Sequence, residues 1–195
     1  MEGEAMTGPN YSPGEYSVKL IRNKDTIETK IRLVLDPKSM YSPDDRSVRQ
    51  TALMKAYTML ESLAYLDRQA KEIRDKASLL ARDVQKPLAR RLTAISSRMD
   101  SLHLKLVSSK EGKLTGEEKL REKIGFIYGS LISYPGRPTD SQLSGLDLLG
   151  KEEDAFRASL QEFISGDLVG INNELARLKK EEIKVISEED FKKEP

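Results

Sequence analysis

A long stretch without glycine or proline constrains the fold more than any other feature of this sequence. Ser42 is suited to cap a helix, Pro43 fits the first helical position, and no further glycine or proline occurs before Pro87. Apolar residues recur at helical spacing, which predicts one helix over residues 42–83, about 60 Å long. Other helices must cover such a rod. Its apolar positions are Leu53, Ala56, Tyr57, Leu60, Leu63, Ala64, Ala70, Ile73, Ala77, Leu80 and Ala81.

Two stretches that alternate apolar and polar residues precede this helix, with turn residues around Asn23 between them. They predict a β-hairpin over residues 14–37, the remnant of a small β-sandwich domain, after an aperiodic leader over residues 1–13. A two-stranded hairpin is marginally stable alone. We therefore expect it to be covered by the start of the long helix near Val48 and Met54, by the leader, or by a second copy of the chain.

Further helical segments follow the long helix. A second helix begins near Pro87, a third opens with a capping box at Thr115, and a last one opens at Thr139 and runs to about residue 180. Gly166 and Gly170 are expected to bend or break the last helix. The second helix has the four-and-three spacing of coiled-coil packing, through Leu88, Leu92, Ile95, Met99, Leu102 and Leu106.

The lengths of these segments predict a mainly α fold. We expect an elongated antiparallel helical bundle over residues 42–186, with three long legs of which the middle one is broken near residues 112–116. A compact four-helix bundle is the alternative. The charged tail over residues 187–195 is expected to fray.

Composition excludes several classes of function. The net charge is +1, so no overall field favours nucleic acid or an acidic membrane surface. The chain has no cysteine, which excludes disulfides and thiolate chemistry. No apolar run approaches the ~18 residues of a membrane span. The first ten residues lack the apolar core of a signal peptide.

Two features suggest chemistry, and both are better explained without it. The segment of residues 145–152 nearly matches the phosphate-binding loop, but Glu152 stands where that loop needs serine or threonine. His103 is the only histidine and flanks the seam residue Leu102, so we interpret it as a residue at the edge of the seam. A zinc site usually requires several histidine or cysteine ligands.

Charged clusters are likewise interpreted as solvated surface. The acidic groups at 152–154, 181–182 and 188–190 lack the spacing that holds two carboxylates across a cleft. A basic group marks the first helical turnaround, but no aromatic residue between Asp67 and Arg98 could stack on a base, and the last acidic segment is expected to neutralise it. We predict no catalytic, cofactor-binding or metal-binding residue and no nucleic-acid partner. The basic residues are Arg68, Lys71, Arg74, Lys76, Arg82, Lys86, Arg90, Arg91 and Arg98.

The order of these segments resembles a known family layout. From residue 13 onward the chain is similar to the C-terminal region of large secreted bacterial β-propeller proteins described as sialidase-like or sortilin-type glycosyl hydrolases. The likeness is one of spacing and lies in residues 13–20, 35–37 and 42–45, then in Gln50, Tyr57, Tyr128, Leu131, Pro138, Thr139 and residues 167–178.

The resemblance implies a non-catalytic C-terminal structural or interaction module of an exported protein whose natural chain begins upstream of Met1. Its partners would be the upstream propeller or another surface protein. The propellers of that family carry tryptophan-bearing Asp-box repeats, which this chain lacks. Two alternatives stay open, an accessory domain of an active glycoside hydrolase that adds substrate or partner contacts, and an independent helical adaptor.

Overall fold

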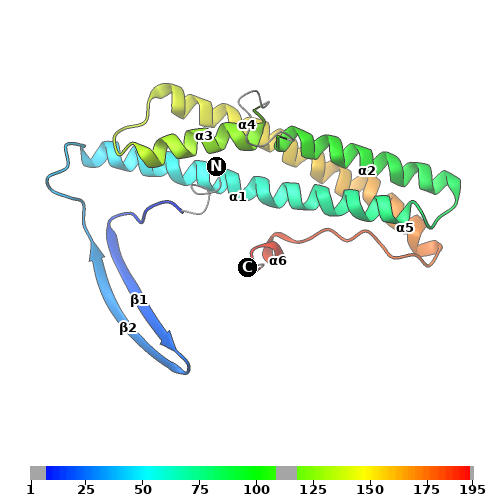
Figure 1. Cartoon of the computed structure of the whole chain (residues 1–195), viewed down its shortest axis with the longest axis horizontal. Helices are drawn as coiled ribbons and strands as arrows, with labels where there is room; N and C mark the ends of the chain where they lie inside the picture. Colours follow the sequence, from blue (N-terminus) through cyan, green and yellow to red (C-terminus); the bar gives the residue numbers. More distant parts are fainter. Residues whose placement is uncertain (1–7, 109–117, 194–195) are drawn as a thin grey trace.

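A computed structural model describes residues 8–108 and 118–193 as a β-hairpin followed by a bundle of helices (Figure 1). The predicted mainly α fold with an N-terminal hairpin is confirmed. The strands are β1 (Gly14–Arg22) and β2 (Asp25–Leu33). The helices are α1 (Pro43–Leu80), α2 (Lys86–Leu106), α3 (Leu120–Ser133), α4 (Asp140–Phe163), a π-helical turn (Ile164–Leu168), α5 (Val169–Arg177) and α6 (Glu188–Phe191).

Helix α1 is the element around which the others are arranged. The Ser42 hydroxyl accepts a hydrogen bond from the Asp45 amide, and the Asp45 carboxylate accepts one from the Ser42 amide, so two free amides of the first turn are satisfied. The helix then runs for 38 residues to Leu80, three residues short of the predicted end. Its buried residues include Leu53, Leu63, Ile73 and Ala77.

Three legs make up the bundle, as predicted. Helix α2 reverses direction after residues 81–85 and lies along the far half of α1, while α3 lies along the near half. Helices α2 and α3 therefore form the middle leg (Figure 1), in which α2 ends at Leu106 and α3 begins at Leu120, and the predicted break near residues 112–116 lies outside the described residues. All six predicted seam residues of α2 are buried. Helices α4 and α5 form the third leg.

The third leg continues through both of its glycines. Gly166 lies in the π-helical turn and Gly170 in α5, and the cap residues Ile164 and Val169 have right-handed helical dihedral angles. Of the expected bend or break, a break is therefore not observed, and the departure from a regular α-helix is the π-helical turn that contains Gly166. The apolar stripe crosses this region through Phe163, Leu168, Ile171 and Leu175, all buried.

Helix α3 begins later than predicted. Lys119 is its N-cap residue, and the Glu122 carboxylate accepts a hydrogen bond from the Lys119 amide at 3.1 Å. Glu122 also accepts from the Ser108 amide at 3.2 Å, which ties the end of α2 to the start of α3. The predicted capping residue Thr115 and the stop at Gly112 lie outside the described residues.

The C-terminal segment lies along the bundle and includes the short helix α6, while the expected fraying of residues 187–195 stays a prediction. Ser187 caps the short helix α6 by accepting from the Asp190 amide at 3.1 Å. Ile183, which precedes it in an extended segment, is 2% exposed and belongs to the hydrophobic core.

The hairpin has a regular register but is not covered as expected. Strands β1 and β2 pair from Gly14↔Leu33 to Arg22↔Asp25 across a two-residue turn in which Asn23 takes a φ of 57°, a conformation that asparagine tolerates. The hairpin projects away from the bundle (Figure 1), and Met54 on α1 stays 41% exposed. The predicted packing against Val48 and Met54 is therefore not observed.

Candidate functional site

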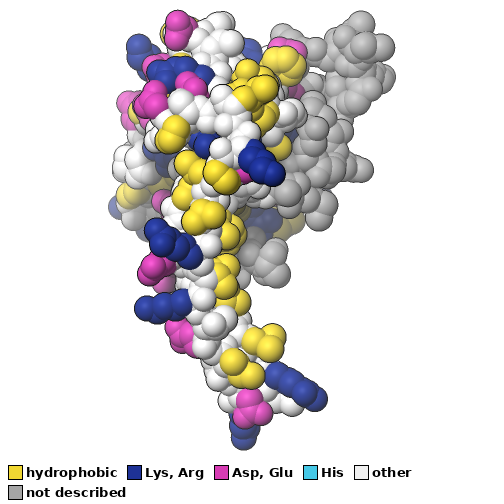
Figure 2. Space-filling view, turned by 90° about the vertical axis from the view of Figure 1, so that its left-hand side faces the viewer, with side chains coloured by type: hydrophobic (Ala, Val, Ile, Leu, Met, Phe, Trp, Pro, Cys, Tyr) yellow, Lys and Arg dark blue, Asp and Glu magenta, His cyan; other side chains and the backbone are white. Residues whose placement is uncertain are grey.

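The projecting hairpin, here called the arm, exposes one apolar face. The register places six apolar side chains on the same side of the two strands. Its most exposed members, Leu20 and Ile27, pair across the strands and are 64% and 66% exposed. Figure 2 shows hydrophobic side chains in a row along the arm. We call this set the arm face: Tyr16, Val18, Leu20, Ile27, Ile31 and Leu33.

The opposite face of the arm is mostly polar. Lys19 pairs with Glu28 at 3.4 Å, and the register also places Glu15 opposite Arg32. Ile21 is the exception, at 69% exposed. A sheet with one apolar and one charged face is typical of a sheet that covers a core on one side and meets water on the other. In the described chain, the five aliphatic residues of the arm face have no such cover, because each is at least 36% exposed.

Leader residues hold the base of the arm. The Tyr11 and Tyr16 rings meet edge to face at 5.4 Å, and the Tyr16 hydroxyl donates to the Ser12 carbonyl at 2.6 Å. The Gln50 amide of α1 donates to the Asn10 carbonyl at 2.9 Å. The leader therefore supplies part of the predicted support, at the root of the arm.

On the other side of the root, the connector between β2 and α1 bounds a shallow cavity of about 490 Å³. Lining residues include Pro37, Tyr41 and Arg46, and the Arg46 Nε atom is buried without a hydrogen-bond partner among the described residues. Nearby, hydrogen bonds from Ser42 and the Arg137 guanidinium lower the pKa of Asp45. The start of α1 is thus linked by Asp44 and Asp45 to Arg137, which lies between α3 and α4.

Arg49 fixes the turn where α3 ends. Its guanidinium donates to the carbonyls of Leu131 and Tyr134, each at 2.7 Å, and to that of Ile132 at 3.1 Å. Burial lowers the pKa of this guanidinium. The contacts satisfy carbonyl groups that the end of a helix leaves free, so we assign Arg49 a structural role.

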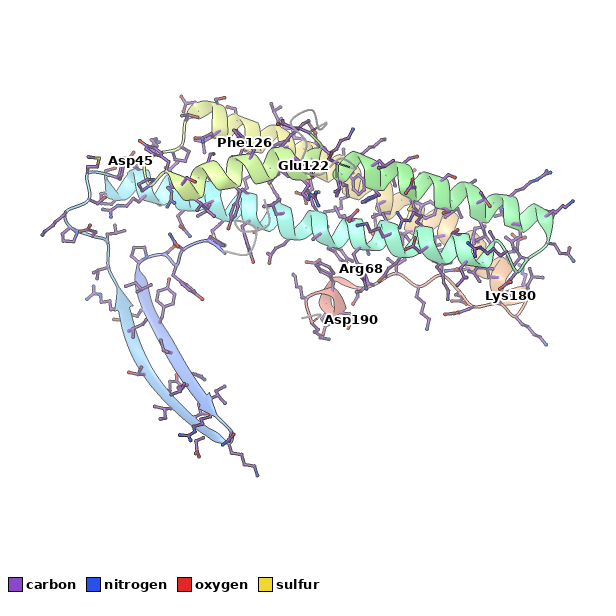
Figure 3. All side chains as sticks on the ribbon, in the orientation of Figure 1. Asp45, Arg68, Glu122, Phe126, Lys180 and Asp190 are labelled. Carbon is purple, nitrogen blue, oxygen red and sulfur yellow. The ribbon has the colours of Figure 1, made fainter. Side chains whose placement is uncertain are left out.

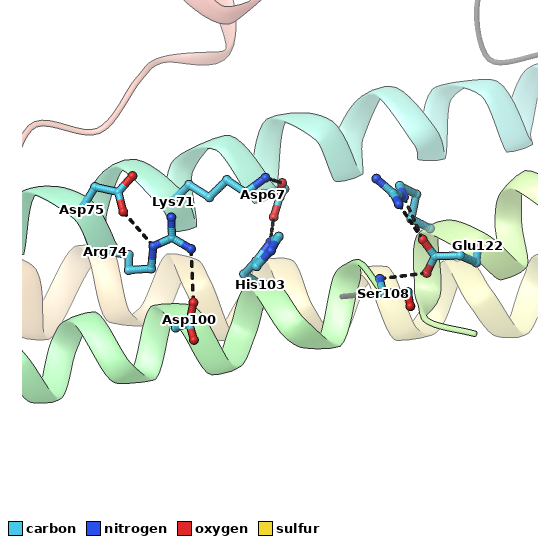
Figure 4. Close-up of polar contacts among 9 residues, drawn as sticks. Asp67, Lys71, Arg74, Asp75, Asp100, His103, Ser108 and Glu122 are labelled. Atoms are coloured by element: carbon cyan, nitrogen blue, oxygen red, sulfur yellow. Dashed lines mark hydrogen bonds and ion pairs between the residues drawn. The ribbon is translucent and has the colours of Figure 1, made fainter. Parts of the chain in front are cut away.

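His103 lies at the edge of the seam, as interpreted from the sequence. Its Nδ1 atom is 2.5 Å from an Asp67 oxygen, and Lys71 pairs with the other Asp67 oxygen at 2.8 Å (Figure 4). One turn away, Arg74 bonds to Asp75 at 2.8 Å and to Asp100 at 3.2 Å. The His103–Asp67 and Arg74–Asp100 contacts join α1 to α2. The Asp67 carboxylate contacts both His103 of α2 and Lys71 of α1, so we assign this cluster a structural role between the two helices.

One acidic residue contradicts the solvated-surface interpretation. Glu152 and Asp154 are exposed, but Glu153 is 7% exposed and bonds to Ser62 of α1 and to Arg157. Arg157 also bonds to Ser62. This closed triangle joins α4 to α1. The sequence did carry a signal, since residue 153 falls on the buried stripe of Leu149, Phe156 and Leu160.

The near match to a phosphate-binding loop lies within a helix. Residues 145–152 belong to α4, whose helical hydrogen bonds leave no loop in which consecutive amides could surround a phosphate. Gly145 contacts Ile127 of α3, where an added Cβ would come within 3.3 Å of the Ile127 side chain. The glycine therefore allows close packing of two helices.

Acidic residues of the third leg neutralise part of the basic turnaround, as expected. Arg91 pairs with Glu174, and Arg98 pairs with Asp167 at 2.8 Å. Arg98 also lies over the Phe163 ring at 5.0 Å. On α1, Lys76 pairs with Glu181 of the C-terminal segment at 2.5 Å. These cations hold the legs together.

Residues 8–108 and 118–193 also lack two features that would indicate a function. No group of histidine, cysteine, aspartate and glutamate side chains there is placed to hold a metal ion. No helix in the same residues combines the length and the apolar character of a membrane span. The arm face is therefore the feature of the described chain that most needs a functional explanation.

Comparisons with protein-family models, curated proteins and solved structures found no match to this chain. The resemblance to the C-terminal region of exported propeller proteins thus stays a prediction from the sequence.

Proposed function

We propose that this chain is a non-catalytic structural and interaction module, in which a helical rod holds out a β-hairpin as its docking arm. The observation that carries the proposal is the arm face, whose aliphatic residues stay 36–66% exposed although they alternate as they would in a buried sheet. The polar clusters described above support it, because each joins one leg of the bundle to another.

The shape of the arm favours a β-sheet as its partner. Nine-residue paired strands give a face about 30 Å long and 10 Å wide. Sheets pack face to face at about 10 Å through alternating side chains, and the arm face presents alternating side chains with the charges turned away. A second sheet would complete a small sandwich on the arm.

We further propose that this sheet belongs to the upstream part of the same natural chain, in an exported protein with a propeller. Support for this finer identity comes from the sequence resemblance over residues 13–20, which form the start of the arm itself. Another surface protein or a second copy of the chain is the alternative occupant, and both are outcomes of the test below.

The test compares the chain alone with the protein that also contains the residues encoded upstream of Met1. Amide hydrogen exchange in β1 and β2 should slow at least tenfold in the longer protein. Replacing Leu20 with lysine should abolish this protection. Ile21→Lys is the matched control, because Ile21 is equally exposed but lies on the opposite face. Unchanged exchange in the longer protein would exclude the upstream sheet as the occupant and leave another protein or a second copy, and equal effects of the two variants would exclude the arm face as the docking surface.

A further inference from the structure

The C-terminal segment of residues 180–191, here called the strap, lies on the bundle like a bound peptide. It leaves the end of α5 at Lys180 and returns along α1 to Asp190, close to Arg68 (Figure 3). Its path from residue 180 to residue 187 has no regular secondary structure. The strap is therefore attached through individual contacts with the bundle, and those contacts define a binding groove.

Most of the polar contacts in this groove recognise the backbone of the strap. The Asn172 side chain of α5 accepts from the Ile183 amide at 2.9 Å and donates to the Ile183 carbonyl at 3.0 Å. Gln69 and Tyr65 of α1 both donate to the Ile186 carbonyl, at 3.1 Å and 3.3 Å. Contacts of this kind require an extended segment but not a particular side chain.

Three side chains of the strap give the groove its selectivity. Ile183 is buried in the core, the Phe191 ring lies 5.5 Å from the Tyr65 ring, and Glu181 pairs with Lys76. The groove thus fits a segment with an acidic residue and a branched apolar residue two positions later in an extended part, followed by a helical turn with an aromatic residue eight positions after the apolar one. A second copy of this chain carries such a segment.

The hinge of the strap is set in a disfavoured conformation. Lys179 takes a φ of 55°, which residues with a Cβ rarely adopt. The Lys180 amide bonds to the Leu175 carbonyl and the Lys179 amide to the Ala176 carbonyl, each at 2.9 Å, which is the helix-ending turn that normally uses glycine at this position. Release of the strap lets Lys179 return to a favoured conformation.

We propose that α1 and α5 form a binding groove for an extended segment, and that the strap of a second copy can replace the resident strap. The exchange preserves every contact of the groove and relaxes the hinge. The resident strap competes at an effective concentration of about millimolar, as tethered ligands do. Closed monomers therefore dominate in dilute solution, and exchange increases with protein concentration. The inference does not involve the arm and is independent of the proposed function.

Cysteine trapping tests the exchange directly, because the chain has no cysteine of its own. One full-length copy carries Lys76→Cys in the groove and another carries Glu181→Cys in the strap. The two are mixed with oxidised glutathione, which accepts the two electrons and two protons released when the thiols join. We expect a covalent dimer whose rate of formation rises with the product of the two protein concentrations.

Three further samples make each outcome decisive. A single chain with both cysteines should form an internal disulfide, which verifies that the strap is seated. A copy with Lys55→Cys replaces the groove partner as the control, since Lys55 lies about 30 Å away along α1. Adding Ile183→Asp to the strap copy should slow trapping at least tenfold.

The proposal is overturned if the internal disulfide forms but the mixed dimer appears no faster than with Lys55→Cys. It is equally overturned if the internal disulfide fails to form while circular dichroism shows a folded bundle, because the strap is then not seated. Leu20→Lys in both copies should leave trapping unchanged. A loss of trapping in that variant would show that association occurs through the arm instead.

Discussion

The interior of the bundle and the arm face carry apolar stripes of similar residues, but only the first is covered. In the bundle, Leu53, Ile73 and Leu92 are 0% exposed. On the arm, Leu20 and Ile27 keep about two thirds of their surface in water. The legs of the bundle supply one another with cover, whereas a hairpin has no second layer. The two regions have similar residue types but differ in burial. The buried stripe of the bundle stabilises the fold, whereas the exposed stripe of the arm is available to a partner.

A charge placed on each stripe should give the largest difference between the two regions. Ile95→Asp in the seam of α2 should lower the free energy of unfolding by about 3–5 kcal/mol, because it buries an unpaired carboxylate. Ile27→Asp on the arm should change it by no more than about 0.5 kcal/mol. Urea unfolding measures both values. The control is Ala94→Asp, since Ala94 is exposed on the same helix. Similar losses for Ile95 and Ile27 would contradict the division between core and arm.

The strap should lie between these extremes. Asn172→Ala removes two hydrogen bonds to the Ile183 backbone and leaves that amide and carbonyl unsatisfied. We expect a loss of about 1–3 kcal/mol in the stability of the strap against local opening. Hydrogen exchange at the Ile183 amide measures this quantity. Asn173→Ala is the matched control, because Asn173 is the exposed neighbour. Equal exchange in the two variants would mean that Asn172 does not hold the strap.

A smaller effect is expected at the start of α1, where the two regions join. Hydrogen bonds from Ser42 and the pairing with Arg137 lower the pKa of Asp45 in the folded state. A lowered pKa means that the stabilisation is present above the ordinary aspartate pKa of about 4 and is lost as the pH falls through the folded-state pKa. Asp45→Asn should therefore reduce the thermal midpoint at pH 7 but not at the acid end of the titration. A difference that persists unchanged there would rule out this ionisation as its source.

Removal of the arm should have the smallest effect on stability. A chain that starts at Lys38 should keep its free energy of unfolding within about 0.5 kcal/mol of the full chain, because the arm buries little against the bundle. The full chain should show weak concentration-dependent association in light scattering, since open strand edges and an apolar face favour self-association. The shorter chain should associate less. If both chains stay monomeric and equally stable, the arm has no docking role in isolation.

The sequence predicted the parts of the fold that depend on local periodicity. The cap at Ser42 and the seam from Leu88 to Leu106 are governed by neighbours in sequence, and both appear as predicted. The seat of the strap depends on Asn172 and Ile183, which meet across a chain reversal and follow no periodic pattern. The Ser187 cap had a recognisable spacing to Asp190, but a four-residue helix is too short to be predicted by periodicity.

The sequence predicted which residues share the arm face but not that this face is left uncovered. Alternation placed Leu20 and Ile27 on one face, as the register confirms. The start of α1 leaves this face open. This depends on the path of residues 34–42 and on the hydrogen bond from Gln50 to Asn10, which are features of tertiary geometry and not of local sequence. Glu153 was misassigned for the opposite reason, because its charge outweighed its position on the buried stripe of α4.

The π-helical turn of the third leg accommodates one additional residue in the helical repeat of this leg. Between Phe163 and Leu168 the buried stripe advances by five residues, where the rest of the leg advances by three or four. In an α-helix one additional residue rotates everything downstream by about 100°, which would turn Ile171 and Leu175 out of the core. A π-helical turn absorbs that residue locally. We therefore expect that loss of one residue within residues 164–168 would turn this segment into a regular α-helix and keep Ile171 and Leu175 in the core.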